Sequence, residues 1–142
     1  MSGERNGLEE RDEHLRTNGD VRLVVPAAPE YLRLVRLTAA GLASRLGFTF
    51  DEVEDLRIAV DELCFHLLGD ATDDGELDGR TMDLIYSAGT DFISITGRTD
   101  LSGAVPEPSD LSEQILDALV DEHEVSGSQG MITFRLKKQR ES

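Results

Sequence analysis

The segment of residues 49–69, "TFDEVEDLRIAVDELCFHLLG", constrains the fold most strongly, because its apolar side chains recur at the spacing of one helix face. Thr49 and Glu52 open it in capping-box spacing, and Gly69 closes it, so we expect a helix between these points. The apolar stripe consists of Val53, Leu56, Val60, Leu63, Cys64 and Leu67. This stripe is predicted to pack into a core, with the Cys64 thiol as a buried structural group.

The opposite side of this helix is polar and carries Asp55, Glu62 and His66. Ile58 lies beside them, which suggests that something covers or lines this side. Glu62 and His66 stand one turn apart and can contact each other. Their residue types allow a general base with a helper, part of a metal site, or an exposed pair without a function. With 3 histidines and 1 cysteine in the whole chain, a closed metal site has few ligands, and none is expected.

The remaining elements follow from shorter patterns. Residues 21–25 read as a strand, 29–46 as a helix closed by Gly47, 81–87 and 91–97 as two strands, 110–125 as a third helix with Ser109 as N-cap, and 131–138 as a last strand. This order predicts an α+β fold, a two-layer sandwich in which about four strands form a mixed sheet with three helices on one face. We expect a disordered tail at residues 1–19, one domain at 20–138 and a short tail at 139–142.

The net charge of −15 is large for 142 residues and excludes some partners. An acidic surface repels phosphate backbones, so direct nucleic-acid binding is not expected. The same field would attract a basic protein partner, or it serves only to keep the protein soluble. The chain has no apolar run long enough to span a membrane and no signal-peptide pattern at its start, so the cytoplasm is the expected location.

The usual nucleotide and nucleophile motifs are absent from the sequence. It contains no GxGxxG, no GxxxxGK[ST] and no GxSxG. The Gly-rich stretches "GDATDDG" and "GRTDLSG" carry acids that would repel a nucleotide unless a metal intervened. From the residues alone, a nucleotide-dependent enzyme is possible, but the chain has few of the residues that usually bind a nucleotide.

The segment "PAAPEYLRLVRLTAAGLASRLGFTFDEVEDLRIAVDELC", together with the element order, resembles the RsbW family over residues 21–137. The resemblance implies a histidine-kinase-like (GHKL) ATPase fold and the function of a bacterial anti-sigma factor with serine-kinase activity. In that family a Glu-x-x-x-Asn pattern supplies the base toward the partner's serine and a magnesium ligand. Glu62 matches the base, whereas His66 stands in place of the asparagine, and imidazole prefers softer metals than Mg²⁺.

The other two nucleotide motifs of the family also differ here. The adenine-binding Asp-x-Gly-x-Gly loop is represented only by Asp100 and Gly103, in another spacing. Where the family opens its last helix with Gly-x-Gly-Leu, this chain has Asp110 and Ser112, and a carboxylate there competes with phosphate for the positive helix end. The resemblance therefore implies a relic of an ATP site with Glu62 as a relic or residual base, no cofactor, and ATP binding that is absent or very weak.

The resemblance further implies protein partners and a homodimer formed through the first strand and first helix. Arg36 aligns with an arginine that contacts the sigma factor or its STAS-domain antagonist, and Arg33 lies one turn earlier; alternatively, both are only the exposed edge of an amphipathic helix. We thus expect an anti-sigma factor that sequesters an alternative sigma factor and is released by a STAS-domain anti-anti-sigma protein. The alternatives are an active serine-protein kinase that uses ATP and magnesium through divergent contacts, and a binding module for another regulator.

Overall fold

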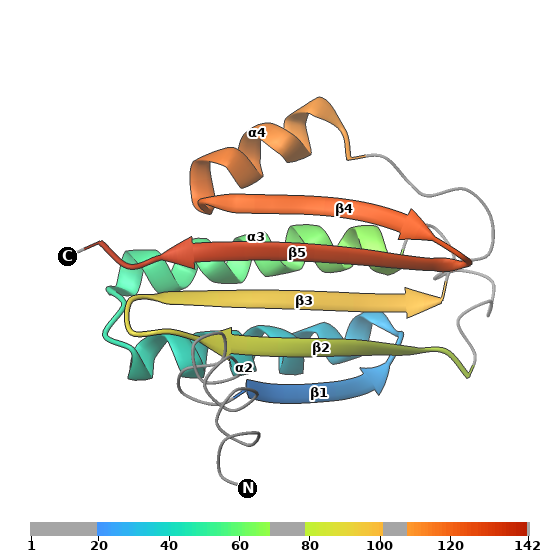
Figure 1. The fold of residues 1–142 in the computed structure, drawn as a ribbon, viewed down its shortest axis with the longest axis horizontal. Helices are drawn as coiled ribbons and strands as arrows, with labels where there is room; N and C mark the ends of the chain where they lie inside the picture. Colours follow the sequence, from blue (N-terminus) through green and yellow to red (C-terminus); the bar gives the residue numbers. More distant parts are fainter. Residues whose placement is uncertain (1–19, 69–78, 101–107, 142) are drawn as a thin grey trace, which may run out of the picture.

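The computed structural model describes residues 20–68, 79–100 and 108–141, which form one sheet and its covering helices (Figure 1). Along the chain these are β1 (Asp20–Pro26), a 3₁₀ turn η1 (Pro29–Tyr31), α2 (Leu32–Arg45), α3 (Phe50–Leu68), β2 (Thr81–Ala88), β3 (Phe92–Asp100), α4 (Asp110–Leu119), β4 (Glu122–Ser128) and β5 (Met131–Gln139). The predicted tail at residues 1–19 lies outside the described residues.

The strands form a single sheet in the order β1-β2-β3-β5-β4, and every neighbouring pair is antiparallel. In Figure 1, α2 and α3 lie side by side behind this sheet, and α4 lies at its β4 edge. Alternate residues of β2, β3 and β5 are buried, as expected for a sheet covered on one face. The predicted two-layer α+β sandwich is therefore confirmed, but the sheet has five antiparallel strands instead of about four in a mixed arrangement.

The additional strand is β4, which the sequence pattern assigned to the end of the third helix. α4 ends at Leu119, because Val120 already has extended backbone angles (φ −134°, ψ 164°). β4 then pairs with β5 along its whole length. The hairpin between them turns at Gln129 and Gly130, whose φ angles are 55° and 75°. Two consecutive residues with positive φ are typical of the tight turn that joins antiparallel strands.

The core lies between the sheet and the inner faces of α2 and α3. Its largest fully buried side chains are Tyr86, Phe134, Leu56, Leu63, Met82, Leu84, Ile93, Ile95, Leu116, Ile132 and Leu136. The predicted burial of Cys64 is confirmed, and burial raises the pKa of its thiol. The hydroxyl of Tyr86 donates to the carbonyl oxygen of Val35 at 3.0 Å and so ties β2 to the first turn of α2.

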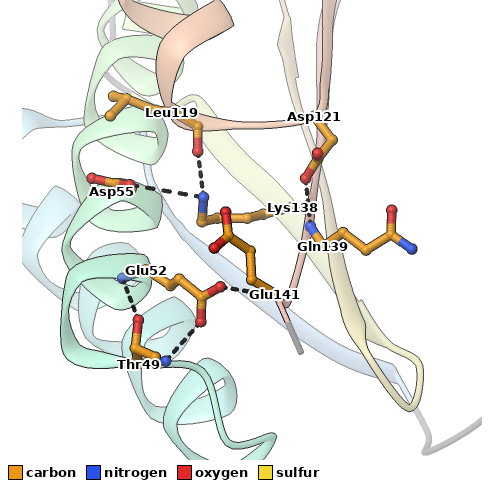
Figure 2. A network of polar contacts seen from close by, with 8 residues as sticks. All are labelled: Thr49, Glu52, Asp55, Leu119, Asp121, Lys138, Gln139 and Glu141. Carbon is orange, nitrogen blue, oxygen red and sulfur yellow. Dashed lines mark hydrogen bonds and ion pairs between the residues drawn. The ribbon is translucent and has the colours of Figure 1, made fainter.

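A polar network joins the start of α3, the end of α4 and the end of β5 (Figure 2). The predicted capping box is present: Thr49 N donates to Glu52 Oε1 at 2.8 Å, and Glu52 N donates to Thr49 Oγ1 at 3.1 Å. The second oxygen of Glu52 accepts from Glu141 N at 2.8 Å. Lys138 donates to the carbonyl oxygen of Leu119 at 2.6 Å and thereby caps α4. Three segments far apart in the sequence are thus held together by hydrogen bonds.

The environment of Glu52 makes this network sensitive to pH. Burial alone would raise the pKa of Glu52, but the N–H groups of Glu141 and Thr49, together with Lys138, outweigh it and lower the pKa. A carboxyl group with a lowered folded pKa stabilises the folded state above its unfolded pKa of about 4.3. This contribution is lost as the pH falls through the lower folded value.

Replacing Glu52 with glutamine is therefore expected to lower the free energy of unfolding by about 1 kcal/mol near neutral pH. The difference from wild type should shrink as the pH falls below about 4. Urea denaturation at a series of pH values measures it. Glu54→Gln is the matched control, because Glu54 pairs only on the surface with Arg57, at 2.7 Å, and its loss should cost less than about 0.5 kcal/mol. A difference that stays constant across the pH range would contradict the role of the Glu52 charge.

Candidate functional site

Glu62 lies on α3 where the first turn of α4 packs against it. The Ser112 hydroxyl donates a hydrogen bond to Glu62 Oε2. Ser112 is buried, and its N–H donates at 3.1 Å to the hydroxyl oxygen of Ser109, which caps α4 as predicted. The local sequence places Ser112 in this first turn, and the packing of α4 on α3 brings it to Glu62. One oxygen of the candidate base is therefore already engaged by a side chain of its own fold.

The N-terminus of α4 is unfavourable for binding an anion. Its first turn carries two carboxylates, Asp110 and Glu113, which interact favourably with the positive helix end. One of the N–H groups that the helix itself leaves unpaired also has a partner, since Ser112 N donates to the Ser109 hydroxyl oxygen. A phosphate group at this helix end would meet two like charges and find fewer available donors.

The other residues predicted for nucleotide binding are not gathered around Glu62 by any described contact. Asp100 ends β3, pairs with Met131 of β5, and its carbonyl oxygen accepts from Arg80. His66 belongs to the last turn of α3, but its side chain lies outside the described residues, as does Gly103. Among the described residues, no group of three or more His, Cys, Asp or Glu could hold a metal ion.

Arg33 and Arg36, the residues predicted to bind a partner, differ in their surroundings on α2. The half-buried Arg36 has an ion pair with Asp61 of α3, in which Arg36 Nη1 lies 3.1 Å from Asp61 Oδ1 and 2.8 Å from Oδ2. Arg33 is exposed. A partner carboxylate would therefore have to compete with Asp61 for Arg36, whereas Arg33 is open to a partner. The contact with Asp61 was not predicted, because it joins two helices across 25 residues of sequence.

The outer edge of the sheet next to α2 is formed by β1. Within the described residues, β1 is the first strand in the sheet order and pairs on one side only, with β2. Val24 of β1 is half exposed, and α2 presents Leu34 and Leu37 to solvent. An edge strand beside exposed apolar side chains is a ready surface for pairing with another chain.

None of the helices in the described part of the chain is both long enough and apolar enough to cross a bilayer.

Comparison with curated proteins finds relatives that are named serine-protein kinase RsbW. The chain is 32% identical over 141 residues to the RsbW of Bacillus subtilis (strain 168), which covers 87% of this chain and 88% of the relative. It is 32% identical over 134 residues to the RsbW of Bacillus velezensis, with 82% of this chain and 84% of the relative covered. A shorter match of 64 residues to the RsbW of Halalkalibacterium halodurans has 42% identity.

Family models and solved structures give different results. No family model matches the chain. Among solved structures, the chain superposes with a TM-score of 0.66 on the RsbU and RsbW domains of Rv1364c from Mycobacterium tuberculosis. The match has 14% sequence identity and covers 87% of this chain and 33% of that one. At this identity the likeness concerns the fold, and it supports the predicted histidine-kinase-like sandwich.

Proposed function

The chain belongs to the RsbW serine-protein kinase family, and from this premise we propose that it is an anti-sigma factor without ATP-dependent kinase activity. It sequesters an alternative sigma factor in the cytoplasm and is released by a STAS-domain anti-anti-sigma protein. Because it does not phosphorylate its antagonist, release depends on the state of that antagonist. The resemblance of its first two helices to the family supports the partners in this proposal.

The observation that carries the loss of kinase activity is the contact between Glu62 and Ser112. A general base must face the hydroxyl whose proton it removes, within hydrogen-bond reach. Here a hydroxyl of the same chain already occupies one oxygen of Glu62. Asp110, Glu113 and Ser112 also stand at the helix end where the family places a phosphate cradle. The remaining function of this domain is protein recognition, with no cofactor bound.

The proposed sigma-binding surface is α2, with Arg33 as its main anchor. α2 carries Arg33, Arg36 and Arg45 and no acidic residue, so it is a basic helix on an acidic domain. An arginine can pair with a partner carboxylate through two hydrogen bonds. We place the homodimer contact at the free edge of β1 and at the exposed Leu34 and Leu37 of α2. With its negative net charge, the domain acts on protein partners and not directly on nucleic acid.

This function is tested by complex formation with candidate sigma factors in the absence of nucleotide. Co-expression should give a stable complex, and Arg33→Glu should weaken it by about 10-fold to 100-fold, because it replaces an anchor with a repelling charge. Arg45→Glu, an equally drastic change at an exposed position near the end of the same helix, should change the affinity less than about 3-fold. Titration by surface plasmon resonance measures both variants.

Two results would count against the proposal. Failure to bind any candidate of this sigma class would exclude sequestration and favour a module for another regulator. Equal losses in Arg33→Glu and Arg45→Glu would show that the general charge of α2, and not a defined anchor, holds the partner.

A further inference from the structure

The charges of the helical layer are strongly partitioned between its helices. α3 and α4 together carry the acidic residues Asp51, Glu52, Glu54, Asp55, Asp61, Glu62, Asp110, Glu113 and Asp117, with Arg57 as their one basic residue. α2 beside them has three arginines and no acid. Part of this charge is paired inside the domain, since Arg36 of α2 contacts Asp61 of α3 and Arg57 contacts Glu54. The helical layer therefore has a basic helix beside two acidic ones, and the proposed function uses only the basic helix.

The outer face of α3 also exposes large apolar side chains. Ile58 is 48% exposed and Phe65 is 69% exposed. They are seven residues apart, so they lie on the same side of the helix, away from the buried stripe that contains Leu56 and Leu63. Leu111, next to the Ser112 that touches α3, is a further exposed apolar residue of α4 at 66%. We call the side of α3 that carries Glu54, Ile58, Asp61 and Phe65 the α3 outer face.

Apolar and acidic residues alternate along this face. Glu54, Ile58, Asp61 and Phe65 follow one another at spacings of four, three and four residues, which keeps them in one row. Such a row offers an amphipathic helix apolar side chains for its apolar stripe. It also offers carboxylates for cationic residues beside that stripe, which would compete with Arg57 for Glu54 and with Arg36 for Asp61. Exposed apolar side chains that lie close together mark interaction sites more often than isolated ones do.

The charge of the face decides which occupant fits it. A second copy of this chain would bring the same acidic face, and two such faces repel each other. A membrane surface with anionic lipids is repelled in the same way. A segment with lysine or arginine beside its apolar stripe would instead be attracted by the long-range field and then bury Ile58 and Phe65.

We propose that the α3 outer face is a second docking surface of this protein, which binds a basic amphipathic helix of a partner protein. It adjoins the proposed sigma-binding surface on α2, because Asp61 pairs with Arg36, and it is more acidic than that surface. The contact combines burial of Ile58 and Phe65 with pairing of the partner's cations to the acids of α3.

The test uses a fluorescently labelled model peptide with leucine and lysine at helical spacing, and the same peptide with glutamate in place of lysine. Fluorescence anisotropy with the full chain should show binding of the lysine peptide, weakened by added salt, and no binding of the glutamate peptide. The double variant Ile58→Ser/Phe65→Ser should weaken binding of the lysine peptide at least about 10-fold. Since both side chains are exposed, its circular dichroism spectrum and melting curve should match wild type.

Tyr31→Ser/Leu111→Ser is the control, because it removes two exposed apolar side chains that belong neither to the row on α3 nor to the proposed homodimer contact. Its effect on peptide binding should stay below about 2-fold. Equal losses in the two double variants, or no loss in Ile58→Ser/Phe65→Ser, would overturn the proposal. So would equal binding of the two peptides. A dimer in sedimentation that dissociates only in Ile58→Ser/Phe65→Ser would show that a second copy occupies the face, and would overturn it as well.

Discussion

Titration of the protein with Mg-ATP is expected to give no binding heat in calorimetry at nucleotide concentrations up to about 1 mM, that is, less than about 4 kcal/mol of binding free energy. Two features of the structure support this result. Ser112 donates its hydroxyl to Glu62, and Asp110 and Glu113 lie at the helix end where a phosphate would bind. The Bacillus subtilis relative, which is named a serine-protein kinase, serves as the positive control.

The same conclusion can be tested through the reaction. Incubation with a STAS-domain protein and labelled ATP should leave that protein unlabelled, and Glu62→Ala should behave like wild type. Micromolar ATP binding would contradict the loss of the nucleotide site. Label transfer that is present in wild type and lost in Glu62→Ala would establish the alternative, an active serine-protein kinase with divergent ATP contacts.

A second form of this experiment asks whether the first turn of α4 alone blocks the nucleotide. Asp110→Gly/Ser112→Gly removes a carboxylate and frees Glu62 from the Ser112 hydroxyl. We expect ATP binding to remain undetectable, because His66 still replaces an oxygen ligand and Asp100 still lacks the spacing of an adenine loop. Restoration of binding by this double variant would locate the whole defect in α4.

The sequence predicted those features that depend on neighbouring residues. The helix expected at residues 49–69 is α3 (Phe50–Leu68), and its apolar stripe is buried at the positions described. The capping box of Thr49 and Glu52 and the N-cap of Ser109 are both present, because each joins residues only three apart. Local spacing is enough to specify such contacts.

The strand β4 shows where local pattern was misleading. Its first residues, "EHEV", continue a strongly helical sequence without a glycine or proline to stop it. What makes them a strand is pairing with β5 and the turn at Gln129 and Gly130, and pairing partners are not visible in the strand itself. The alternation of Glu122, His123, Glu124 and Val125 was the available signal, but it is short.

The candidate site was predictable in its parts but not in its contacts. Glu62 and Ser112 were both identified from the sequence, as a possible base and as a replaced cradle residue. Their hydrogen bond crosses 50 residues and depends on the angle at which α4 packs on α3. The pairing of Arg36 with Asp61 depends in the same way on the packing of α2 against α3. Long-range packing therefore decides which of the predicted side chains meet.

Replacement of Phe134 with alanine should be among the most destabilising changes in this chain, at about 3–5 kcal/mol. Phe134 is fully buried in β5 and lies directly opposite Gly97 of β3. A Cβ atom at Gly97 would lie 2.8 Å from the Phe134 ring and 3.3 Å from Leu84 of β2. The ring therefore fills the space that the missing side chain leaves at the centre of the sheet.

This arrangement predicts that the two positions are coupled. Gly97→Ala in the wild-type background should cost about 1–3 kcal/mol, because its methyl group must displace the ring of Phe134. In the Phe134→Ala background the ring is gone, and the same methyl group enters vacated space. A double-mutant cycle measured by urea denaturation should then give a coupling energy of about 1 kcal/mol or more, with Gly97→Ala less costly in the second background.

Phe50→Ala supplies the control for loss of a phenyl ring, because Phe50 is 77% exposed and its truncation should change stability by less than about 0.5 kcal/mol. Additivity of Gly97→Ala and Phe134→Ala within about 0.5 kcal/mol would show that the ring does not occupy the space above Gly97. Coupling of the predicted sign would instead establish that β3 and β5 are matched by shape at this point. The glycine in a central strand would then be required by its aromatic neighbour.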